Sequence, residues 1–254
     1  MEITFLGTGT STGIPVICCH CEVCTSDDPR DNRTRTSAYV QTPEINFVID
    51  TGPDFREQLL REGIEDIDAV LYTHSHKDHI AGLDDIRPIN YFKGKTIEVY
   101  ASEGTLKRLR QEYAYVFAND YPGVPQILVH EIKERYLDLN GLQVEVLHAM
   151  HGQMPVLGFR IKDFVYLTDI NFMEPEEMAR LRDVDTLVLN AIHHRPHYSH
   201  FNLEEALAFI KQVNPKNTYL IHFSHQMGKH ADVEAGLPDN VGVSYDGLKL
   251  QFDD

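Results

Sequence analysis

Three histidines and one aspartate lie within six residues, as His74, His76, Asp78 and His79. They follow the apolar run 69–72, which predicts a buried strand. Residues two apart point to the same side of an extended chain, so the first two imidazoles can meet. Imidazole nitrogens and carboxylate oxygens bind divalent metals, and such a cluster is costly to bury without one. The stretch therefore predicts a metal centre at the carboxyl end of a strand.

All four cysteines of the chain lie between positions 18 and 24. This spacing is too tight for a disulfide framework across a domain, and the first residues do not resemble an export signal. Metal binding is then the better explanation, with thiolates from Cys19, Cys21 and Cys24. A tetrahedral zinc needs a fourth ligand, for which the candidates are His225 and, nearer in sequence, Cys18 and His20.

Three other predicted strands also lead to a metal-ligand type of residue. The run 142–148 alternates as a strand and His151 follows it, the run 164–169 ends at Asp169, and the run 218–222 ends at His222. A fold that aligns these strand ends with His74 would bring all of these side chains into one site.

The first quarter of the chain is predicted to consist mainly of strands. Residues 2–6 form one, and residues 37–42 and 45–50 form a hairpin. The glycines of residues 7–13 lack the lysine of a phosphate-binding loop, so we expect them to allow close approach to the metal centre. Asp50 has two interpretations, a helix N-cap or a hydrogen-bond partner of a metal-bound histidine.

The remaining elements alternate between helices and strands. Asn202 followed by Glu205 predicts a capping box that opens a helix to Val213. The aromatic segment 113–125 either packs in the ordinary way or covers the active site and stacks on a base or sugar. The other predicted elements are helices 54–63 and 103–113, strands 97–100 and 186–190, a hairpin of strands 156–161 and 164–169, and a turn with a closing strand within 245–250.

Composition limits the possible functions. The chain has 254 residues, which we interpret as one domain over 1–254, with a net charge of −16. This charge argues against non-specific nucleic-acid binding but leaves a phosphate substrate open, because bound dications dominate the local field. No apolar run approaches the roughly 18 residues that a membrane span needs. We expect a cytoplasmic protein with no membrane partner.

The motif His-x-His-x-Asp-His resembles that of the metallo-β-lactamase superfamily. The resemblance implies an α/β fold, the four-layer αββα sandwich, with two divalent metals, either zinc or manganese, with iron as a further candidate. It implies one metal on His74, His76 and His151, the other on Asp78, His79 and His222, with Asp169 bridging. Metals about 3.5–4 Å apart make a bridging hydroxide that can attack a phosphodiester. The departing alkoxide then needs a proton, for which His200 is the candidate and His193, His194 and His197 are rivals.

A narrower resemblance rests on the cysteine loop. The phosphoribosyl cyclic phosphodiesterase family of the carbon–phosphorus lyase pathway has an early Cys-x-Cys-x-x-Cys zinc loop, closed by a histidine three residues after the last active-site histidine. His225 stands in that relation to His222, and His200 lies where that family has its catalytic histidine. The resemblance implies a small phosphodiester substrate, with cyclic diesters included, a structural zinc on the loop 18–24, and Asp78 and His200 as catalytic residues. The aromatic segment 113–125 and the extra histidines at 193–197 depart from that family.

Three other functions remain as alternatives. A tRNA 3′-endonuclease of the RNase Z type needs a basic, glycine-rich arm, which the sequence lacks. A thiolesterase resembling glyoxalase II lacks the cysteine loop. A non-catalytic protein resembling the pyrroloquinoline quinone accessory protein has a similar loop but need not keep all active-site ligands. The full ligand set of this chain favours an enzyme over such a protein.

A homodimer is a further expectation, with the zinc loop near the N-terminus at its interface.

Overall fold

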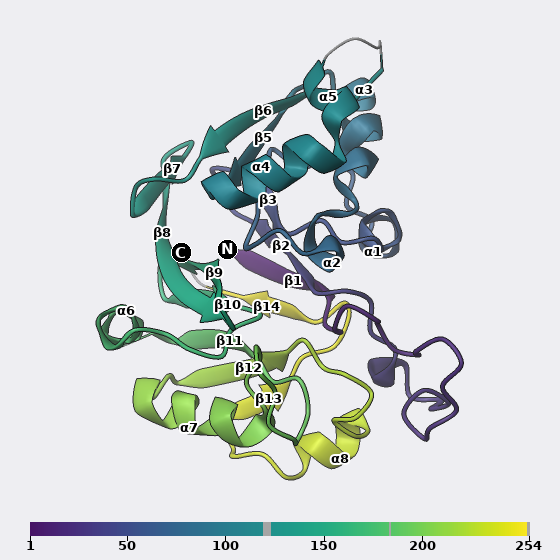
Figure 1. The fold of residues 1–254 in the computed structure, drawn as a ribbon, viewed down its shortest axis with the longest axis vertical. Coiled ribbons are helices and arrows are strands. Elements are labelled where there is room, and N and C mark those ends of the chain that lie inside the picture. The colour runs from purple at the N-terminus through teal and green to yellow at the C-terminus, as the bar shows by residue number, and fades with distance from the viewer. Residues whose placement is uncertain (119–122, 183, 253–254) are drawn as a thin grey trace.

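The structure is a computed structural model that describes residues 1–118, 123–182 and 184–252. Two seven-stranded sheets pack face to face, and helices cover their outer faces (Figure 1). The strand order is β14-β1-β2-β3-β4-β5-β6 in the first sheet and β13-β12-β11-β10-β9-β8-β7 in the second. The predicted α/β fold, a four-layer αββα sandwich, is confirmed.

The first sheet comes from the first half of the chain together with the last strand. Its strands are β1 (Glu2–Gly7), β2 (Ser37–Gln41), β3 (Asn46–Ile49), β4 (Ala69–Leu71), β5 (Ile97–Ala101), β6 (Ile127–Glu131) and β14 (Lys249–Gln251). Its helices are α1 (Phe55–Glu62), α2 (Lys77–Ile80), α3 (Arg87–Lys93), α4 (Glu103–Glu112) and α5 (Ala114–Ala118), with 3-10 turns at Pro29–Asp31 and Leu83–Ile86.

The second sheet follows in the second half. Its strands are β7 (Tyr136–Leu139), β8 (Leu142–His151), β9 (Met154–Ile161), β10 (Phe164–Leu167), β11 (Thr186–Asn190), β12 (Asn217–Ile221) and β13 (Val241–Val243). Its helices are α6 (Pro175–Met178), α7 (Leu203–Val213) and α8 (His230–Glu234), with a 3-10 turn at Ala179–Leu181. No helix in the described ranges is long and apolar enough to cross a membrane.

Three apolar layers separate the four layers of the sandwich. In β10, Phe164 and Tyr166 belong to the cluster between the sheets, whereas Val165 and Leu167 pack in the cluster under α7. Val70 of β4 packs likewise in the cluster that contains α1 and α4 side chains. Because successive strand residues point to opposite faces, strands covered on both faces read as continuous apolar runs. This explains why these strands were predictable.

The parallel strands place the predicted ligands at one edge of each sheet. β3, β4, β5 and β6 run parallel to one another, as do β10, β11, β12 and β13. Their carboxyl ends therefore lie at a common edge. The backbone N–H of Leu157 in β9 donates to the carbonyl of Thr73 at 3.0 Å, which joins the two sheets at this edge.

Some elements were missed or placed differently from the sequence. β6 is a partly exposed edge strand and β13 has only three residues, so neither carries a strong apolar pattern. His151 ends β8 rather than following it, because the β8–β9 pairing continues to His151 opposite Met154. In the aromatic segment, Tyr113 is buried and α5 follows it, while Tyr121 and Pro122 lie outside the described residues.

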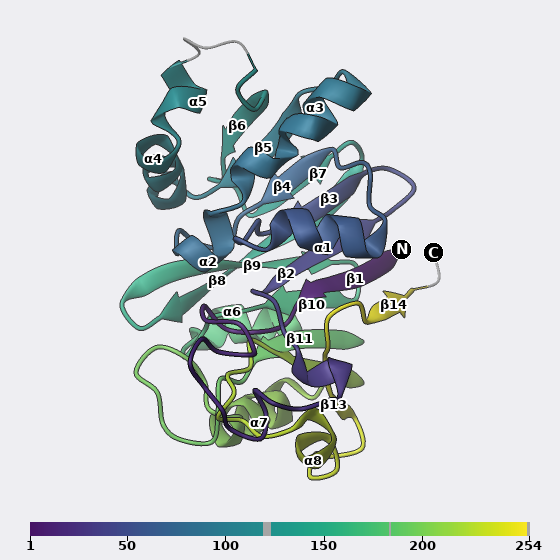
Figure 2. The ribbon, with the colours of Figure 1, turned by 90° about the vertical axis from the view of Figure 1, so that its right-hand side faces the viewer.

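The segment between β1 and β2 runs from the first sheet across the second half of the molecule (Figure 2). Buried Arg33 holds it there by donating to Thr8 Oγ1 at 2.9 Å and to the Ser244 carbonyl at 2.6 Å. The glycines at its start approach this segment rather than the ligands, since a Cβ on Gly7 would lie 1.9 Å from the carbonyl oxygen of Arg35.

Candidate metal centres

His74 and His79 are oriented by hydrogen bonds on the ring side that faces away from the site. His79 Nδ1 donates to Asp50 Oδ2 at 2.7 Å. The hydroxyl of Thr73 donates to the same carboxylate at 2.7 Å, so its oxygen can accept from His74 Nδ1 at 2.9 Å. Asp50 is therefore a partner of the histidines and not a helix N-cap; the N-cap of α1 is Asp54.

His151 and His222 are also contacted by the protein through Nδ1. His151 Nδ1 donates to the carbonyl of Ser199 at 2.7 Å. Thr36 Oγ1 donates to the Gly9 carbonyl at 2.8 Å and lies 3.1 Å from His222 Nδ1, from which it can accept. Thr36, Thr73 and the Ser199 carbonyl are functional contacts that sequence reasoning missed; only the position of Thr73 directly before His74 gave a signal.

The opposite nitrogens of three of these rings form no hydrogen bond. Nε2 of His74, His79 and His222 is buried and makes no hydrogen bond to any part of the chain that the structure describes. Buried polar atoms are almost always paired, so three unpaired imidazole nitrogens in one place indicate a missing ligand. A metal-bound histidine has this form, with one nitrogen on the protein and the other on the metal. The residues thus fit divalent metals.

Asp169 lies at the centre of the site. Its Oδ2 is 3.3 Å from His79 Nε2 and 3.7 Å from His74 Nε2, while its Oδ1 is 3.0 Å from His222 Nδ1. Oδ2 thus faces an unbonded nitrogen from each predicted ligand set, whereas Oδ1 contacts His222 on the nitrogen opposite its unbonded Nε2. Groups whose ligand atoms lie within 4.8 Å of one another include His74, His76 and His151; His74, His79 and Asp169; and Asp78, Asp169 and His222.

Three of these side chains leave strand ends in a left-handed conformation. Asp50, Asp169 and His222 have φ values of 63°, 58° and 64°, each one or two residues after an apolar strand. A non-glycine residue at positive φ costs free energy and persists only where its surroundings fix it. Here the turn directs each side chain into the common edge of the sheets.

Charge and burial oppose one another at the centre. Burial alone would lower the pKa of His79, but the carboxylates of Asp169, Asp50 and Asp78 outweigh it and raise that pKa well above the ordinary value. For His74 burial dominates, and the pKa falls well below the ordinary value. The carboxylates are therefore arranged to favour positive charge at this point, which is what a metal centre needs.

His200 lies beside the predicted ligands. Its ring centroid is 4.4 Å from that of His151 and 4.9 Å from that of His222. Burial and the neighbouring imidazoles lower the pKa of His200 to about 2, against the opposing charge of Asp169. Two of the alternative proton donors have other neighbours. The ring centroid of His197 is 5.1 Å from that of His200, and His194 Nε2 donates to the Met227 carbonyl at 2.8 Å.

The predicted zinc loop also brings its side chains together. Cys19, Cys21, Cys24 and His225 place one ligand atom each within 4.8 Å of one another. His225 Nδ1 lies 3.3 Å from Cys19 Sγ and 3.4 Å from Cys21 Sγ. Cys18 is exposed and outside this group, as is His20. Hydrogen bonds from the Cys24 backbone and from His225 lower the pKa of Cys21 to about 6, which favours the thiolate.

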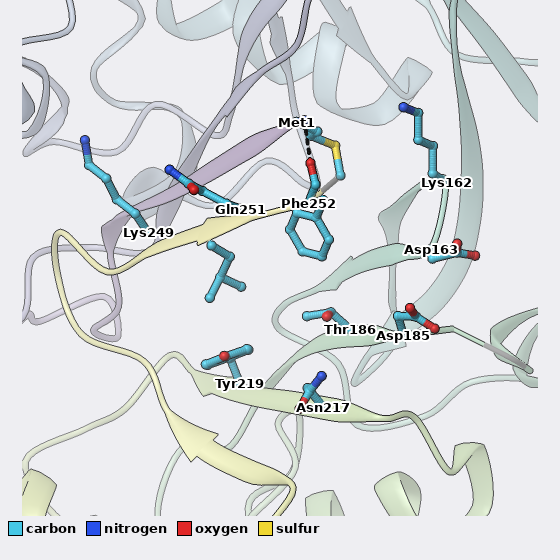
Figure 3. A pocket seen from close by; sticks show the side chains of 11 residues that line it. Met1, Lys162, Asp163, Asp185, Thr186, Asn217, Tyr219, Lys249, Gln251 and Phe252 are labelled. Carbon is cyan, nitrogen blue, oxygen red and sulfur yellow. Dashed lines mark hydrogen bonds between the residues drawn. The ribbon is translucent and has the colours of Figure 1, made fainter. Parts of the chain in front are cut away.

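Two cavities lie at opposite ends of the second sheet. One, of about 540 Å³, is lined by His76, His151, Gly152, Gln153, Met154, Asn171 and Tyr198, and so opens onto the ligands. The other, of about 480 Å³, lies at the amino ends of β11 and β12 (Figure 3), where the amino group of Met1 donates to the Phe252 carbonyl at 3.0 Å. Of these two cavities, the first combines space for a substrate with the candidate metal ligands.

The fold and this ligand set define a class of protein. Residues 45–223 match the Beta-lactamase superfamily domain. The chain therefore belongs to the metallo-β-lactamase superfamily, as the motif at His74–His79 predicted.

A solved structure gives the narrower assignment. The crystal structure described as a new diphosphatase from the PhnP family is 39% identical, has a TM-score of 0.93, and matches 99% of this chain and 96% of its own. This chain belongs to the PhnP family. The family resemblance that the sequence analysis based on the cysteine loop is confirmed.

Two curated relatives carry other names. The octanoyltransferase of Porphyromonas gingivalis is 40% identical over 258 residues, all of this chain but 52% of that protein. The coenzyme PQQ synthesis protein B of Methylorubrum populi is 28% identical over 171 residues, 61% of this chain and 54% of that protein. The chain thus spans about half the length of the curated relatives it matches.

Proposed function

We propose that this chain hydrolyses a small phosphodiester with a dinuclear metal centre and a separate structural zinc. The observation that carries the proposal is the set of four imidazoles around Asp169, each held by the protein through Nδ1, three of them with a buried and unpaired Nε2. Buried nitrogens that lie close together beside a carboxylate and form no hydrogen bond are suited to binding cations. A cyclic diester and a linear one are both within this proposal.

The ligands divide into two sets. His74, His76 and His151 would hold one ion and Asp78, His79 and His222 the other, with Asp169 shared. The ions are zinc or manganese, with iron as a further candidate. When bound, two such ions supply an activated water and neutralise the charge of the phosphodiester. Asp50, Thr73 and Thr36 orient the rings, and the cavity beside His76 receives the substrate.

His200 is proposed to protonate the departing oxygen. Its ring touches two of the ligand rings, so a scissile phosphate on the metals lies within its reach. Burial lowers the pKa of His200 in the free site, so the ring is neutral there. It becomes a cation when an anionic phosphate beside it offsets the effect of burial. Substrate binding and protonation of His200 are thus coupled.

The alternatives are less well supported by the site. The net charge of −16 disfavours a long RNA partner. Octanoyl transfer through a covalent intermediate needs a Ser, Cys or Lys nucleophile, and none lines the cavity beside the ligands within the described ranges. The proposed compartment is the cytoplasm, where the thiolates of the zinc loop stay reduced. A homodimer through that loop stays a prediction.

Metal content measured beside diester hydrolysis tests the proposal. We expect about three metals per purified chain, and turnover of bis(p-nitrophenyl) phosphate or a 2′,3′-cyclic nucleotide. The matched variant Asp78→Ala should keep the fold and the zinc of the cysteine loop but lose turnover. A single zinc and no turnover after addition of manganese would contradict the proposal and favour a non-catalytic binding protein.

A further inference from the structure

Helices α1 and α3 present large apolar side chains to solvent. On α3, Tyr91 is 82% exposed and Phe92 is 79% exposed, and their ring centroids lie 5.1 Å apart in an edge-to-face arrangement. Leu60, near the end of the neighbouring α1, is 65% exposed (Figure 2). Single exposed apolar residues are ordinary, but three on two neighbouring helices indicate an interaction surface. This surface is called the α1–α3 face below.

The aromatic pair of α3 forms a ridge between two hollows. Phe92 lines both of them, one of about 650 Å³ and the other of about 620 Å³, and Asp85 also lines both. The apolar residues around the second hollow come from both helices and are Leu59, Leu60, Ile64, Pro88 and Ile89. A ridge beside apolar grooves can interlock with an identical surface across a two-fold axis, because each ridge then enters a groove of the other copy.

Hydrogen bonds hold α3 in place. The side chain of Asn90 donates to the carbonyl oxygens of Lys95 and Gln126, both at 2.9 Å. Its Oδ1 accepts from the N–H of Gln126 at 3.0 Å. Ile89 is buried in the apolar cluster that contains α1 and α4 side chains. The ridge is therefore formed before any partner arrives, and such a surface binds at a lower cost in conformational entropy.

Charge favours a second copy of this chain as the occupant of the face. The net charge of the chain is −16, so two copies repel each other in most orientations. The two hollows differ from the rest of the chain, because the charged residues that line them are three cations and three anions: Arg56, Arg87, Lys93, Glu65, Asp84 and Asp85. This locally neutral and apolar face lets two like-charged chains meet, and it does not attract a strongly basic or acidic partner.

The face is also large enough for a dimer. Together, 17 residues line the two hollows. A standard protein interface uses roughly 20–30 residues on each side, and its aromatic residues often dominate the binding energy. Tyr91 and Phe92 can fill that role. At the cysteine loop, which is the other candidate interface, the large apolar side chain that the described residues expose is Ile17.

We propose that the α1–α3 face joins two copies of this chain in a two-fold symmetric dimer, with the aromatic ridge of each copy in the hollows of the other. This inference goes beyond the proposed function. No residue that lines these two hollows is a predicted metal ligand or lines the cavity beside His76. In a two-fold interface each residue is used twice, so one substitution removes two sets of contacts.

Sedimentation equilibrium of the full chain over a range of concentrations tests this inference. We expect the wild-type protein to have twice the mass of one chain, and its Tm to rise with protein concentration. Phe92→Asp places two carboxylates in an apolar interface and should raise the dissociation constant about 100-fold or more. Because Phe92 is exposed in a single copy, this variant should keep its circular dichroism spectrum and its metal content.

Two further variants are the controls. Phe92→Leu keeps an apolar side chain and should weaken the dimer far less than Phe92→Asp does. Ile17→Ser changes an exposed residue beside the cysteine loop and should leave the dissociation constant unchanged. A wild-type protein that is a monomer at its highest soluble concentration would overturn the inference. So would a dimer that Phe92→Asp does not weaken, or one that Ile17→Ser dissociates instead. Each of these results leaves the proposed function intact.

Discussion

His151 donates its Nδ1–H to the carbonyl oxygen of Ser199 at 2.7 Å, and the next residue is His200. One hydrogen bond thus orients a predicted metal ligand and fixes the loop that carries the predicted proton donor. The rings of His151 and His200 lie 4.4 Å apart as a result. Any substrate held at the ligands is therefore also beside His200, and this geometry does not depend on the loop closing over the site.

Replacing His200 should reveal its role through the leaving group. A general acid contributes about 10²–10⁴-fold when the leaving oxygen is basic, and little when it departs readily as an anion. We expect His200→Ala to lose activity strongly on a diester with an alkyl alcohol leaving group, and only weakly on bis(p-nitrophenyl) phosphate. Steady-state kcat on the two diesters measures this, with His194→Ala as control. The same loss on both would show that His200 is not the proton donor.

Replacing Asp50 should weaken the metal centre without touching a metal ligand. Asp50 accepts from His79 Nδ1 at 2.7 Å and from the N–H of Thr73 at 2.8 Å, so its loss frees the ring of His79. Losing such a partner costs about 10–100-fold in metal affinity. Competition with a chelator should show this drop for Asp50→Ala. Asp54→Ala is the control, because Asp54 pairs with Arg35 at 3.0 Å, and an equal effect of both would refute the assignment.

The sequence predicted the ligand-bearing strands because they are buried on both faces and read as apolar runs. It could not distinguish the two interpretations of Asp50, since a carboxylate after a strand fits both until its neighbours are known. Thr36 was beyond prediction because its partner, His222, lies 186 residues away. The edge strand β6 was missed for the opposite reason: a half-exposed strand has a weak apolar pattern.

The cysteine loop should lose its metal and its stability together. Cys21→Ser removes a thiolate that lies 3.4 Å from His225 Nδ1 and should lower the zinc content by about one per chain. Binding free energy of a structural zinc is also folding free energy, and a loss of about 2 kcal/mol corresponds to a Tm lower by about 4–8 °C. Cys18→Ser is the matched control, since Cys18 is exposed and outside the group. Unchanged zinc content in Cys21→Ser would remove the basis for a structural site.

Arg33 should be the costliest of the structural contacts to lose. Only 3% of Arg33 is exposed, and it donates to Thr8 Oγ1 and to the Ser244 carbonyl while its guanidinium lies 4.9 Å from the Phe223 ring centroid. Phe223 directly follows His222 and precedes the segment of His225, so this one cation supports the chain between both predicted metal sites.

Arg33→Met keeps much of the side-chain volume but leaves Thr8 Oγ1, the Ser244 carbonyl and His230 Nδ1 without their donor, and a buried group left unpaired costs about 1–3 kcal/mol. We expect a free energy of unfolding lower by about 2–5 kcal/mol in urea denaturation. Arg108→Met breaks an exposed pair on α4 and should stay within about 0.5 kcal/mol of the parent protein. If the two variants were equally stable, the segment between β1 and β2 would have to be held by its backbone hydrogen bonds alone.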